Sequence, residues 1–410
     1  MKDNIYFDNA SSSQLSEAVF EAMAPFLQAG YGNPSSLHKI GVEAKSAISK
    51  ARQQVADVIN SSPKDIIFTS GGTESTNLAI LGVAQKYQLK YQKIGHIITS
   101  KIEHEAVLEP IKFLEQMGWK VTYLPVDKFG VVSIEDLKKF VRKDTVLVSV
   151  MYANNETGAI QPIEEIGKSI AGINRARNSQ KLLPIYFHSD ACQAGGLFNI
   201  DVQKLKLDLL TLNGSKINGP KGSGILYKKS SVELEPQIRG GGQENGFRSG
   251  TENTPAIVGF GEALKIAKRD RSKNVKKLSS IQTLFENLLA KNISGIIVNG
   301  PKNSKLRLSE NNFGLRKLPS TVNFSIEGVE GEALMYYLDS AGFCVATGSA
   351  CTTSSTNPSH VLLAMGVSPE LARSTIRVSF GYNTNKRDVV KFVSVLSKTV
   401  EILKKTTQEI

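Results

Sequence analysis

The chain has 410 residues, of which 40% are hydrophobic, 7% aromatic and 21% charged, and its formal net charge is +12. This length is too great for one small core and predicts two domains, and the composition is that of an ordinary globular protein. The excess lysines and arginines are scattered and lack the interleaved aromatic residues of basic nucleic-acid-binding motifs, so we do not expect direct contact with nucleic acid.

Cysteine content and apolar runs exclude further classes of protein. The three cysteines are too few and too unevenly spaced for a disulfide framework, and together with the five histidines they show no zinc-ligand spacing. We therefore expect a reducing compartment and no bound metal. Residues 1–13 contain acids and no long apolar run, unlike a signal or transit peptide. No run of 18 apolar residues occurs, so we expect a cytoplasmic protein that does not span a membrane.

Short apolar runs alternate with amphipathic segments over the first two thirds of the chain. The runs predicted to be strands are 65–70, 96–100, 121–126, 146–151, 184–190, 208–213 and 223–227. Between them, residues 76–88 and 162–176 have apolar side chains at helical spacing. Strands that alternate with helices predict an α/β fold whose mostly parallel sheet is covered by helices on both faces.

The pattern changes after about residue 262. A long charged helix is predicted near 260–291, and after it come shorter strands interleaved with helices, at 296–300, 320–326 and 374–380. We therefore predict a large domain over residues 13–262 and a smaller α+β domain over residues 263–410, which the N-terminal residues 1–12 join.

Polar residues follow several predicted strands, at the edge of the sheet where α/β proteins bind ligands. The glycine-rich turn with Gly72 and Thr73 offers backbone N–H groups and a hydroxyl to an anion such as phosphate. Later strand ends are followed by His104, Asn155, Asp190, Gln193, Ser215 and Lys216. Each residue alone has an ordinary explanation, such as capping or solvation. Together, one strand end after another supplies a ring, an amide, a carboxylate and a lysine.

Pyridoxal phosphate requires a set of this kind. It needs a lysine for its Schiff base, a carboxylate that keeps the pyridine nitrogen protonated, and hydrogen-bond donors around its phosphate. A histidine stacked above the ring can also move protons. Both Lys216 and Lys221 are candidates for the Schiff base from spacing alone, and we prefer Lys216 because it lies nearer to the strand end.

Cys351 lies in a run of small polar residues, 346–355, that cannot pack a core and is typical of a loop. Such a thiol is either a chance surface group or a group that reacts. Cys192 and Cys344 lie instead in apolar, strand-like surroundings, where we expect a cysteine to pack as a small hydrophobic residue.

Motifs along nearly the whole chain resemble those of the cysteine desulfurases of the NifS/IscS type, in the class V aminotransferase group of fold-type I pyridoxal-phosphate enzymes. They include FTSGGTESTNLAI, ITSKIEHEAV, VSVMYANNETGAIQPI, HSDACQ, SKINGPKGSG, GGGQENGFRSGTEN, GSACTT and STIRVSFG. The resemblance implies the fold-type I architecture, a homodimer, and conversion of L-cysteine to L-alanine with a persulfide on Cys351. A cysteine that carries sulfur must reach both the cofactor and an outside acceptor, which explains why Cys351 lies in a flexible loop of small residues.

The resemblance also implies roles for the other site residues. Gly72, Thr73, Asn155 and Gln193 would hold the cofactor, while His104 stacks on its ring, Asp190 pairs with its nitrogen and Lys216 forms the Schiff base. Thr251 would reach the phosphate in the partner subunit. Arg377 would bind the substrate carboxylate, a bidentate task suited to arginine, with Asn33 and Asn155 nearby.

Two residues depart from the family pattern. Asn213 and Ser215 stand where the family usually has a serine and a histidine that bind phosphate. Both can still donate hydrogen bonds, so we expect the phosphate to be bound through a rearranged network.

The long loop around Cys351 is similar to that of members that donate sulfur directly to several acceptors. An iron–sulfur scaffold protein and enzymes that thiolate tRNA or other nucleic acids are the expected acceptors. The alternatives are a selenocysteine lyase or another class V enzyme, and a catalytically weakened scaffold in sulfur trafficking. Cys351 argues against an aminotransferase, and the retention of Lys216, Asp190 and Arg377 argues against an idle scaffold.

Overall fold

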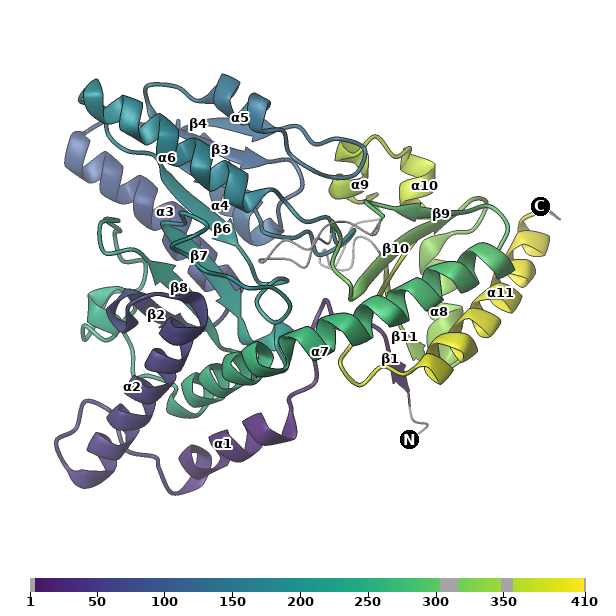
Figure 1. Ribbon diagram of the computed structural model, residues 1–410, viewed down its shortest axis with the longest axis horizontal. Helices are drawn as coiled ribbons and strands as arrows, with labels where there is room; N and C mark the ends of the chain where they lie inside the picture. Colours follow the sequence, from purple (N-terminus) through teal and green to yellow (C-terminus); the bar gives the residue numbers. More distant parts are fainter. Residues whose placement is uncertain (1–3, 303–315, 348–356, 409–410) are drawn as a thin grey trace.

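The computed structural model describes residues 4–302, 316–347 and 357–408 (Figure 1). Its larger sheet has seven strands in the order β2-β8-β7-β6-β5-β3-β4. The strands are β2 (Ile66–Thr69), β3 (His96–Ser100), β4 (Lys120–Leu124), β5 (Thr145–Ser149), β6 (Tyr186–Asp190), β7 (Leu209–Asn213) and β8 (Gly224–Lys228). Neighbours from β4 to β7 pair in parallel, whereas β8 is antiparallel to both β7 and β2. The predicted α/β architecture with a mostly parallel sheet is confirmed.

Helices cover both faces of this sheet, and the alternation of side chains along each strand supplies both cores. Ile97 and Leu147 pack in one core with α3 (Gly72–Tyr91) and α4 (Glu105–Gln116). Their neighbours Ile98 and Val148 point the other way, into a core shared with α6 (Ile163–Ser179). The strands read as nearly continuous apolar runs because both of their faces are buried.

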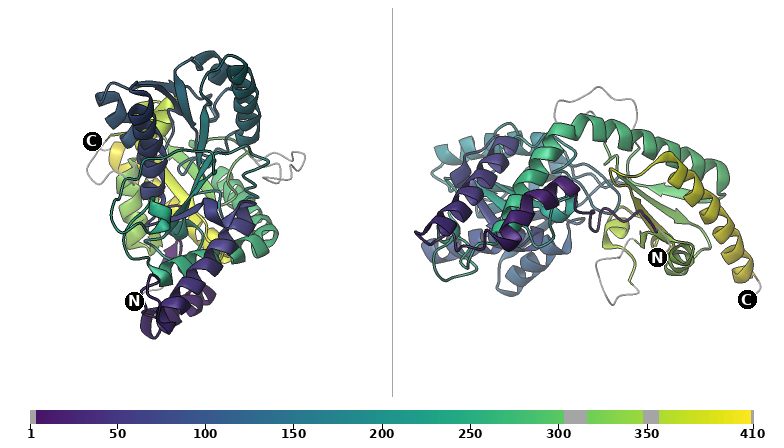
Figure 2. Two further views of the ribbon diagram at one scale, coloured as in Figure 1. Left: turned by 90° about the vertical axis from the view of Figure 1, so that its left-hand side faces the viewer. Right: turned by 90° about the horizontal axis from the view of Figure 1, so that it is seen from below.

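The long helix α7 (Thr254–Asn292) runs from the larger sheet to the smaller one (Figures 1 and 2). It begins six residues before the predicted start near residue 260, because the side chain of Asn253 caps its first turn by accepting from the Ala256 N–H at 3.2 Å. Its early glycines obscured the helical pattern. At Gly261 a Cβ would lie 2.9 Å from the Cα of Ala51 on α2 (Lys39–Ile59), so glycine permits close helix packing.

The smaller part of the molecule contains an antiparallel sheet in the order β12-β13-β10-β9. Its strands are β9 (Ile296–Asn299), β10 (Thr321–Ile326), β12 (Ala346–Thr347) and β13 (Thr375–Ser379). The helices around it are α8 (Gly331–Ser340), α9 (His360–Ala364), α10 (Pro369–Arg373) and α11 (Lys386–Gln408). The N-terminal strand β1 (Ile5–Tyr6) pairs in parallel with β11 (Phe343–Cys344). The domain boundaries at residues 12 and 262 remain a prediction.

The remaining helices are α1 (Glu17–Gln28) and α5 (Ile134–Phe140), with the short 3-10 helices η1 (Pro63–Asp65), η2 (Gly214–Lys216) and η3 (Glu244–Gly246). No helix in the described part of the chain is both long and apolar enough to cross a membrane.

Candidate active site

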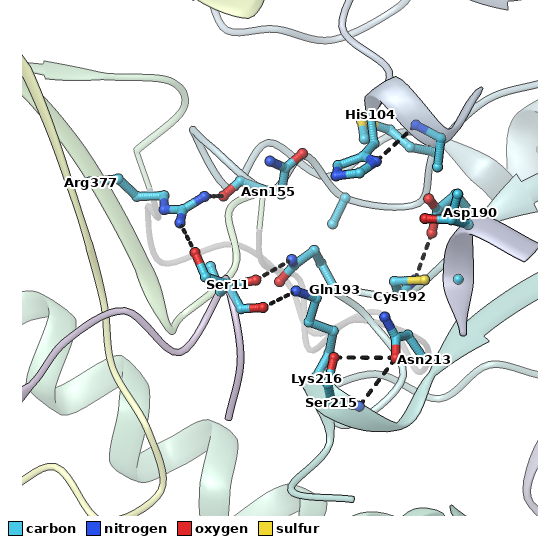
Figure 3. A pocket seen from close by; sticks show the side chains of 16 residues that line it. Ser11, His104, Asn155, Asp190, Cys192, Gln193, Asn213, Ser215, Lys216 and Arg377 are labelled. Carbon is cyan, nitrogen blue, oxygen red and sulfur yellow. Dashed lines mark hydrogen bonds between the residues drawn. The ribbon is translucent and has the colours of Figure 1, made fainter. Parts of the chain in front are cut away.

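A cavity of about 380 Å³ lies where the carboxyl ends of the larger sheet's strands face the smaller part of the molecule (Figure 3). Its lining residues are Ala10, Ser11, Gly72, Thr73, His104, Ala106, Met151, Ala153, Asn155, Asp190, Cys192, Gln193, Asn213, Ser215, Lys216 and Arg377. Ten of these residues are site residues predicted from the sequence. Segments that are more than 360 residues apart along the chain, around Ser11 and Arg377, meet in one cavity.

The turns after β6 and β7 place a carboxylate and a lysine on the cavity wall. Asp190 is the last residue of β6 and is 8% exposed. Lys216 ends η2, which directly follows β7, and its Nζ donates to the backbone carbonyl of Ser11. The alternative lysine, Lys221, is exposed and does not line the cavity. This placement supports Lys216 as the cofactor lysine.

The glycine-rich turn between β2 and α3 forms another wall. A Cβ on Gly72 would lie 2.9 Å from the Sγ of Cys192, so a larger residue would displace the turn from the cavity wall. Gly71, the N-cap of α3, contributes no capping side chain, and Thr73 lines the cavity beside Gly72. A helix N-terminus with a hydroxyl beside it favours an anion such as phosphate.

The two residues that depart from the family pattern contact each other. The backbone N–H and the hydroxyl of Ser215 both donate to Asn213 Oδ1, at 3.2 Å each. Ser215 is 9% exposed and both residues line the cavity. The pair thus forms a small polar network beside the glycine-rich turn, as a rearranged phosphate site would require.

His104 is the N-cap of α4 and also lines the cavity. Its Nδ1 accepts from the Ala106 N–H at 3.0 Å, so the neutral ring carries its proton on Nε2. The preceding residue, Glu103, is completely buried, and its Oε1 accepts from the Ser100 hydroxyl at 2.6 Å and from the Met151 N–H at 2.9 Å. Burial raises the pKa of Glu103 to about 8. A buried carboxyl group that is mostly protonated at neutral pH therefore directly precedes His104 in the chain.

Cys192 is not part of a strand, contrary to the prediction from its apolar surroundings. It lies in the turn after β6, lines the cavity, and donates its backbone N–H to Asp190 Oδ1 at 2.9 Å. Burial, with the nearby charge of Asp190, raises the pKa of its thiol well above the ordinary value. Cys192 is therefore held as a neutral thiol and is poorly suited to act as a nucleophile. Cys344 lies in β11, as a packing residue would.

A buried cation forms the far end of the cavity. Arg377, in the middle of β13, is 1% exposed, and its Nη2 lies 2.8 Å from Asp8 Oδ1 and 2.7 Å from Ser11 Oγ. Its Nη1 donates to the carbonyl of Asn155 at 3.2 Å. Figure 3 shows Arg377 and Asp190 at opposite ends of the cavity. This separation suits an anionic group at one end and a basic ring nitrogen at the other.

Three predicted site residues do not line this cavity in the described part of the chain. Asn33 and Thr251 are both exposed and do not line it, and Cys351 lies outside the described residues. Sequence reasoning missed Asp8 and Ser11, and it assigned Cys192 to packing. The run of four small polar residues at 9–13, interrupted only by Ala10, was the available signal for Ser11.

The residues present fit pyridoxal phosphate. The cavity joins a lysine amine, a buried carboxylate, a histidine ring and a glycine-rich helix start, which are the groups that the cofactor's aldehyde, pyridine nitrogen, ring face and phosphate require. Gln193 adds an amide, held by donation of its Nε2 to the Ala10 carbonyl at 3.0 Å. Among the described residues, no group of three or more His, Cys, Asp or Glu side chains is arranged to hold a metal ion.

Known proteins resemble this chain over nearly its whole length. Residues 5–392 match the family model of class-V aminotransferases. A cysteine desulfurase IscS from Dictyoglomus turgidum is 45% identical over 404 residues, covering 98% of this chain and 96% of the relative. A solved NifS-like protein is 36% identical with a TM-score of 0.87, covering 97% of this chain and all of the other. The structure of SspA in complex with cysteine is also 36% identical, with a TM-score of 0.75 and coverage of 92% and 98%.

Proposed function

This chain belongs to the class-V aminotransferase family, and within it to the IscS and NifS cysteine desulfurases, and we propose that it converts L-cysteine to L-alanine and passes the sulfur to Cys351. The observation that carries the proposal is the single cavity in which Lys216, Asp190 and Arg377 meet. The fold is that of fold-type I pyridoxal-phosphate enzymes. The relative solved with bound cysteine supports L-cysteine as the substrate.

Pyridoxal phosphate, the cofactor of this enzyme family, supplies an electron sink when it is bound. Lys216 would hold it covalently through Nζ, and Asp190 would keep its pyridine nitrogen protonated. Gly72 and Thr73, with Asn213 and Ser215, would surround its phosphate. The amides of Asn155 and Gln193 would hold its ring substituents, and the ring of His104 would lie against its face.

The remaining residues bind and orient the substrate and move protons. Arg377 binds the carboxylate of L-cysteine, since a buried guanidinium offers charged donors in a fixed plane. Lys216 Nζ and His104 Nε2 are the groups that exchange protons with the substrate. The small apolar side chains of Ala106 and Ala153 complete the wall.

Sulfur leaves the substrate by transfer to Cys351. The thiolate of Cys351 attacks the Sγ of L-cysteine, so that an S–S bond forms while the Cβ–Sγ bond breaks. The electron pair of that bond stays with Cβ, which gains a proton and becomes the methyl group of L-alanine. Residues on either side of the Cys351 segment lie close to the cavity: Ala346 pairs with the lining residue Arg377, and Ser359 donates at 2.5 Å to Glu156, the neighbour of the lining residue Asn155. These contacts support Cys351 as the acceptor.

The active unit is a homodimer whose partner supplies Thr251 to the site. The exposure of Thr251 supports this arrangement, because it does not line the cavity of its own chain. The persulfide then passes to acceptor proteins, either an iron–sulfur scaffold or a thiolation enzyme, in the cytoplasm.

A Cys351→Ser variant tests the proposal. It should keep the absorption of the bound cofactor and the spectral change on adding L-cysteine, yet release no alanine above background and accept no ³⁵S label. Serine is nearly the same size, but its hydroxyl is far less ionised than a thiol and far less nucleophilic. Cys344→Ser is the matched control and should keep its activity. A Cys351→Ser enzyme that desulfurates L-cysteine at the wild-type rate would refute the assignment.

A further inference from the structure

A segment near the N-terminus crosses the cavity from the smaller part of the molecule to the larger sheet. We call residues 8–13 the N-terminal strap. At one end the Ala10 N–H donates to the Ser379 hydroxyl on β13 at 2.8 Å. At the other end the Ser13 N–H donates to the Ser215 carbonyl at 2.7 Å, and the Ser13 hydroxyl donates to the same oxygen at 2.8 Å. The strap is thus tied to β13 on one side and to the cavity residue Ser215 on the other.

Two strap residues, Asp8 and Ser11, hold one nitrogen of Arg377. Both hydrogens of Nη2 are used, since it donates to Asp8 Oδ1 at 2.8 Å and to Ser11 Oγ at 2.7 Å. The Ser11 hydroxyl donates in turn to the same Asp8 oxygen at 2.9 Å, which closes a triangle of three hydrogen bonds. Two hydrogen bonds from one nitrogen fix the plane of the guanidinium group.

The other donors of the guanidinium are left for a ligand. Nη1 makes one hydrogen bond, to the Asn155 carbonyl. Nε is buried and has no hydrogen-bond partner among the residues that the structure describes. A buried donor without a partner is costly, so an anion that reached Nε would be bound strongly. Both two-nitrogen edges of a guanidinium include Nη2, and the strap occupies Nη2, so a carboxylate would bind here through a single hydrogen bond from Nε.

Ser11 also connects the two chemical ends of the cavity. Its hydroxyl contacts Arg377 and its backbone carbonyl accepts from Lys216 Nζ. The group that binds the substrate carboxylate and the amine that holds the cofactor are therefore placed by contacts to one residue.

We propose that Asp8 and Ser11 are positioning residues for the substrate, which orient the guanidinium of Arg377 so that its buried Nε hydrogen receives the carboxylate of the amino acid. This inference rests on the proposed function, in which Arg377 binds that carboxylate. Asp8 also supplies the negative charge that offsets the buried cation while the site awaits its substrate.

The test compares kinetic constants of the cofactor-loaded enzyme for L-cysteine. In Asp8→Ala and Ser11→Ala, KM should rise about tenfold, the loss expected for a charge-assisted hydrogen bond, while kcat changes less than about twofold. The bound-cofactor absorption should not change. Asp8→Asn keeps an oxygen acceptor and should show a smaller rise in KM than Asp8→Ala. Ser12→Ala is the matched control on the strap, since its hydroxyl neither bonds to Arg377 nor lines the cavity.

A double-mutant cycle separates this inference from the function on which it rests. If Asp8 acts through Arg377, adding Asp8→Ala to Arg377→Ala should raise KM no further, because contacting residues that act together are not additive. Additive effects, or an Asp8→Ala and a Ser11→Ala enzyme with the wild-type KM, would overturn the inference. An Arg377→Ala enzyme with the wild-type KM would instead refute Arg377 as the carboxylate site. If Asp8→Ala does not fold, the Asp8→Asn and Ser11→Ala cycles with Arg377→Ala decide the question.

Discussion

The two ends of the cavity are built in different ways. The end that we propose binds the cofactor, the cofactor end, takes its groups from successive strand ends of one mostly parallel sheet, such as Asp190 at the end of β6 and Lys216 after β7. The substrate end takes Arg377 from β13 of another sheet and Asp8 from the N-terminal strap, and these two residues are 369 positions apart. The cofactor end therefore follows from chain order, whereas the substrate end exists only once distant segments have met.

This difference predicts how substitutions at each end affect the protein. A change at the cofactor end alters one group on a scaffold that is already fixed by the buried sheet, so the chemistry should fail while the fold persists. A change at the substrate end alters a contact between separate parts of the molecule, so binding should suffer first. The predictions below separate these outcomes, beginning with the largest effect.

Replacing Lys216 should have the largest effect, because it removes a group at the chemical centre. Lys216→Arg keeps a positive charge but cannot bond covalently to the cofactor, and its turnover should fall by about 10²–10⁴-fold, the usual loss of a proton-transferring group. Alanine release measures this loss. Lys221→Arg is the matched control and should remain active, since Lys221 is exposed.

Peptide mapping provides an independent check of the same lysine. After borohydride reduction of the wild-type enzyme, the pyridoxyl label should lie on the peptide that contains Lys216. A label on Lys221 would contradict our account of the cofactor end.

Arg377→Lys should separate the substrate end from the cofactor end. A lysine keeps the charge but loses the planar donors, so KM for L-cysteine should rise by about 10–100-fold, equivalent to about 1.5–3 kcal/mol. The absorption of the bound cofactor should not change, because Arg377 lies away from the groups at Asp190. Loss of cofactor from this variant would show that the two ends are not independent.

Ser215→His should sharpen the account of the phosphate site. If Asn213 and Ser215 only partly replace the usual ligands, a histidine at this position should tighten cofactor binding, by at most about 1.5–3 kcal/mol, or leave it unchanged. The cofactor dissociation constant, measured by dialysis and absorption, decides the result. Weaker binding would mean that the Ser215–Asn213 hydrogen bonds define a different phosphate geometry.

Glu103→Gln should have the smallest effect on catalysis, because its expected effect is on the pH dependence of stability. The pKa of Glu103 is raised from 4.5 to about 8 in the folded chain, so the folded protein retains a proton that the unfolded chain releases. The stability that this group contributes is fully present below about pH 4.5 and is lost as the pH rises to about 8. The slope is about 1.4 kcal/mol per pH unit at its steepest.

Urea unfolding at pH 5, 6.5 and 8 measures this slope. Glu103→Gln has no proton to release, so its free energy of unfolding should fall less over this range than that of the wild type. Equal slopes for the two proteins would mean that Glu103 is not protonated in the folded state.

Much of the cofactor end was predictable from residue order. The apolar runs that predicted strands at 96–100 and 208–213 correspond to β3 and β7, and the polar residues after the strands line the cavity. This succeeded because the carboxyl ends of parallel strands lie at one edge of a sheet, so residues after different strands are brought together by the fold class alone. The motif spacing also identified the family, which the comparisons confirm.

The positions and ionisation of individual side chains at the cofactor end were less predictable. Cys192 was assigned to packing because the residues before it are apolar, yet the turn after β6 directs it to the cavity. Glu103 gave no sign of its raised pKa, because that shift depends on burial by residues from other strands.

By itself, the sequence determined the α/β architecture, the residues at the strand ends, and the family with its cofactor, and it predicted a reactive cysteine at Cys351. The local periodicity of apolar residues and the short motifs carry this information without reference to distant contacts. The tertiary structure alone decided that Asp8 and Ser11 hold Arg377 and that Ser11 also contacts Lys216. Those contacts depend on how β1 pairs with β11 and how the strap crosses between two sheets, and no local pattern encodes a pairing across more than 300 residues.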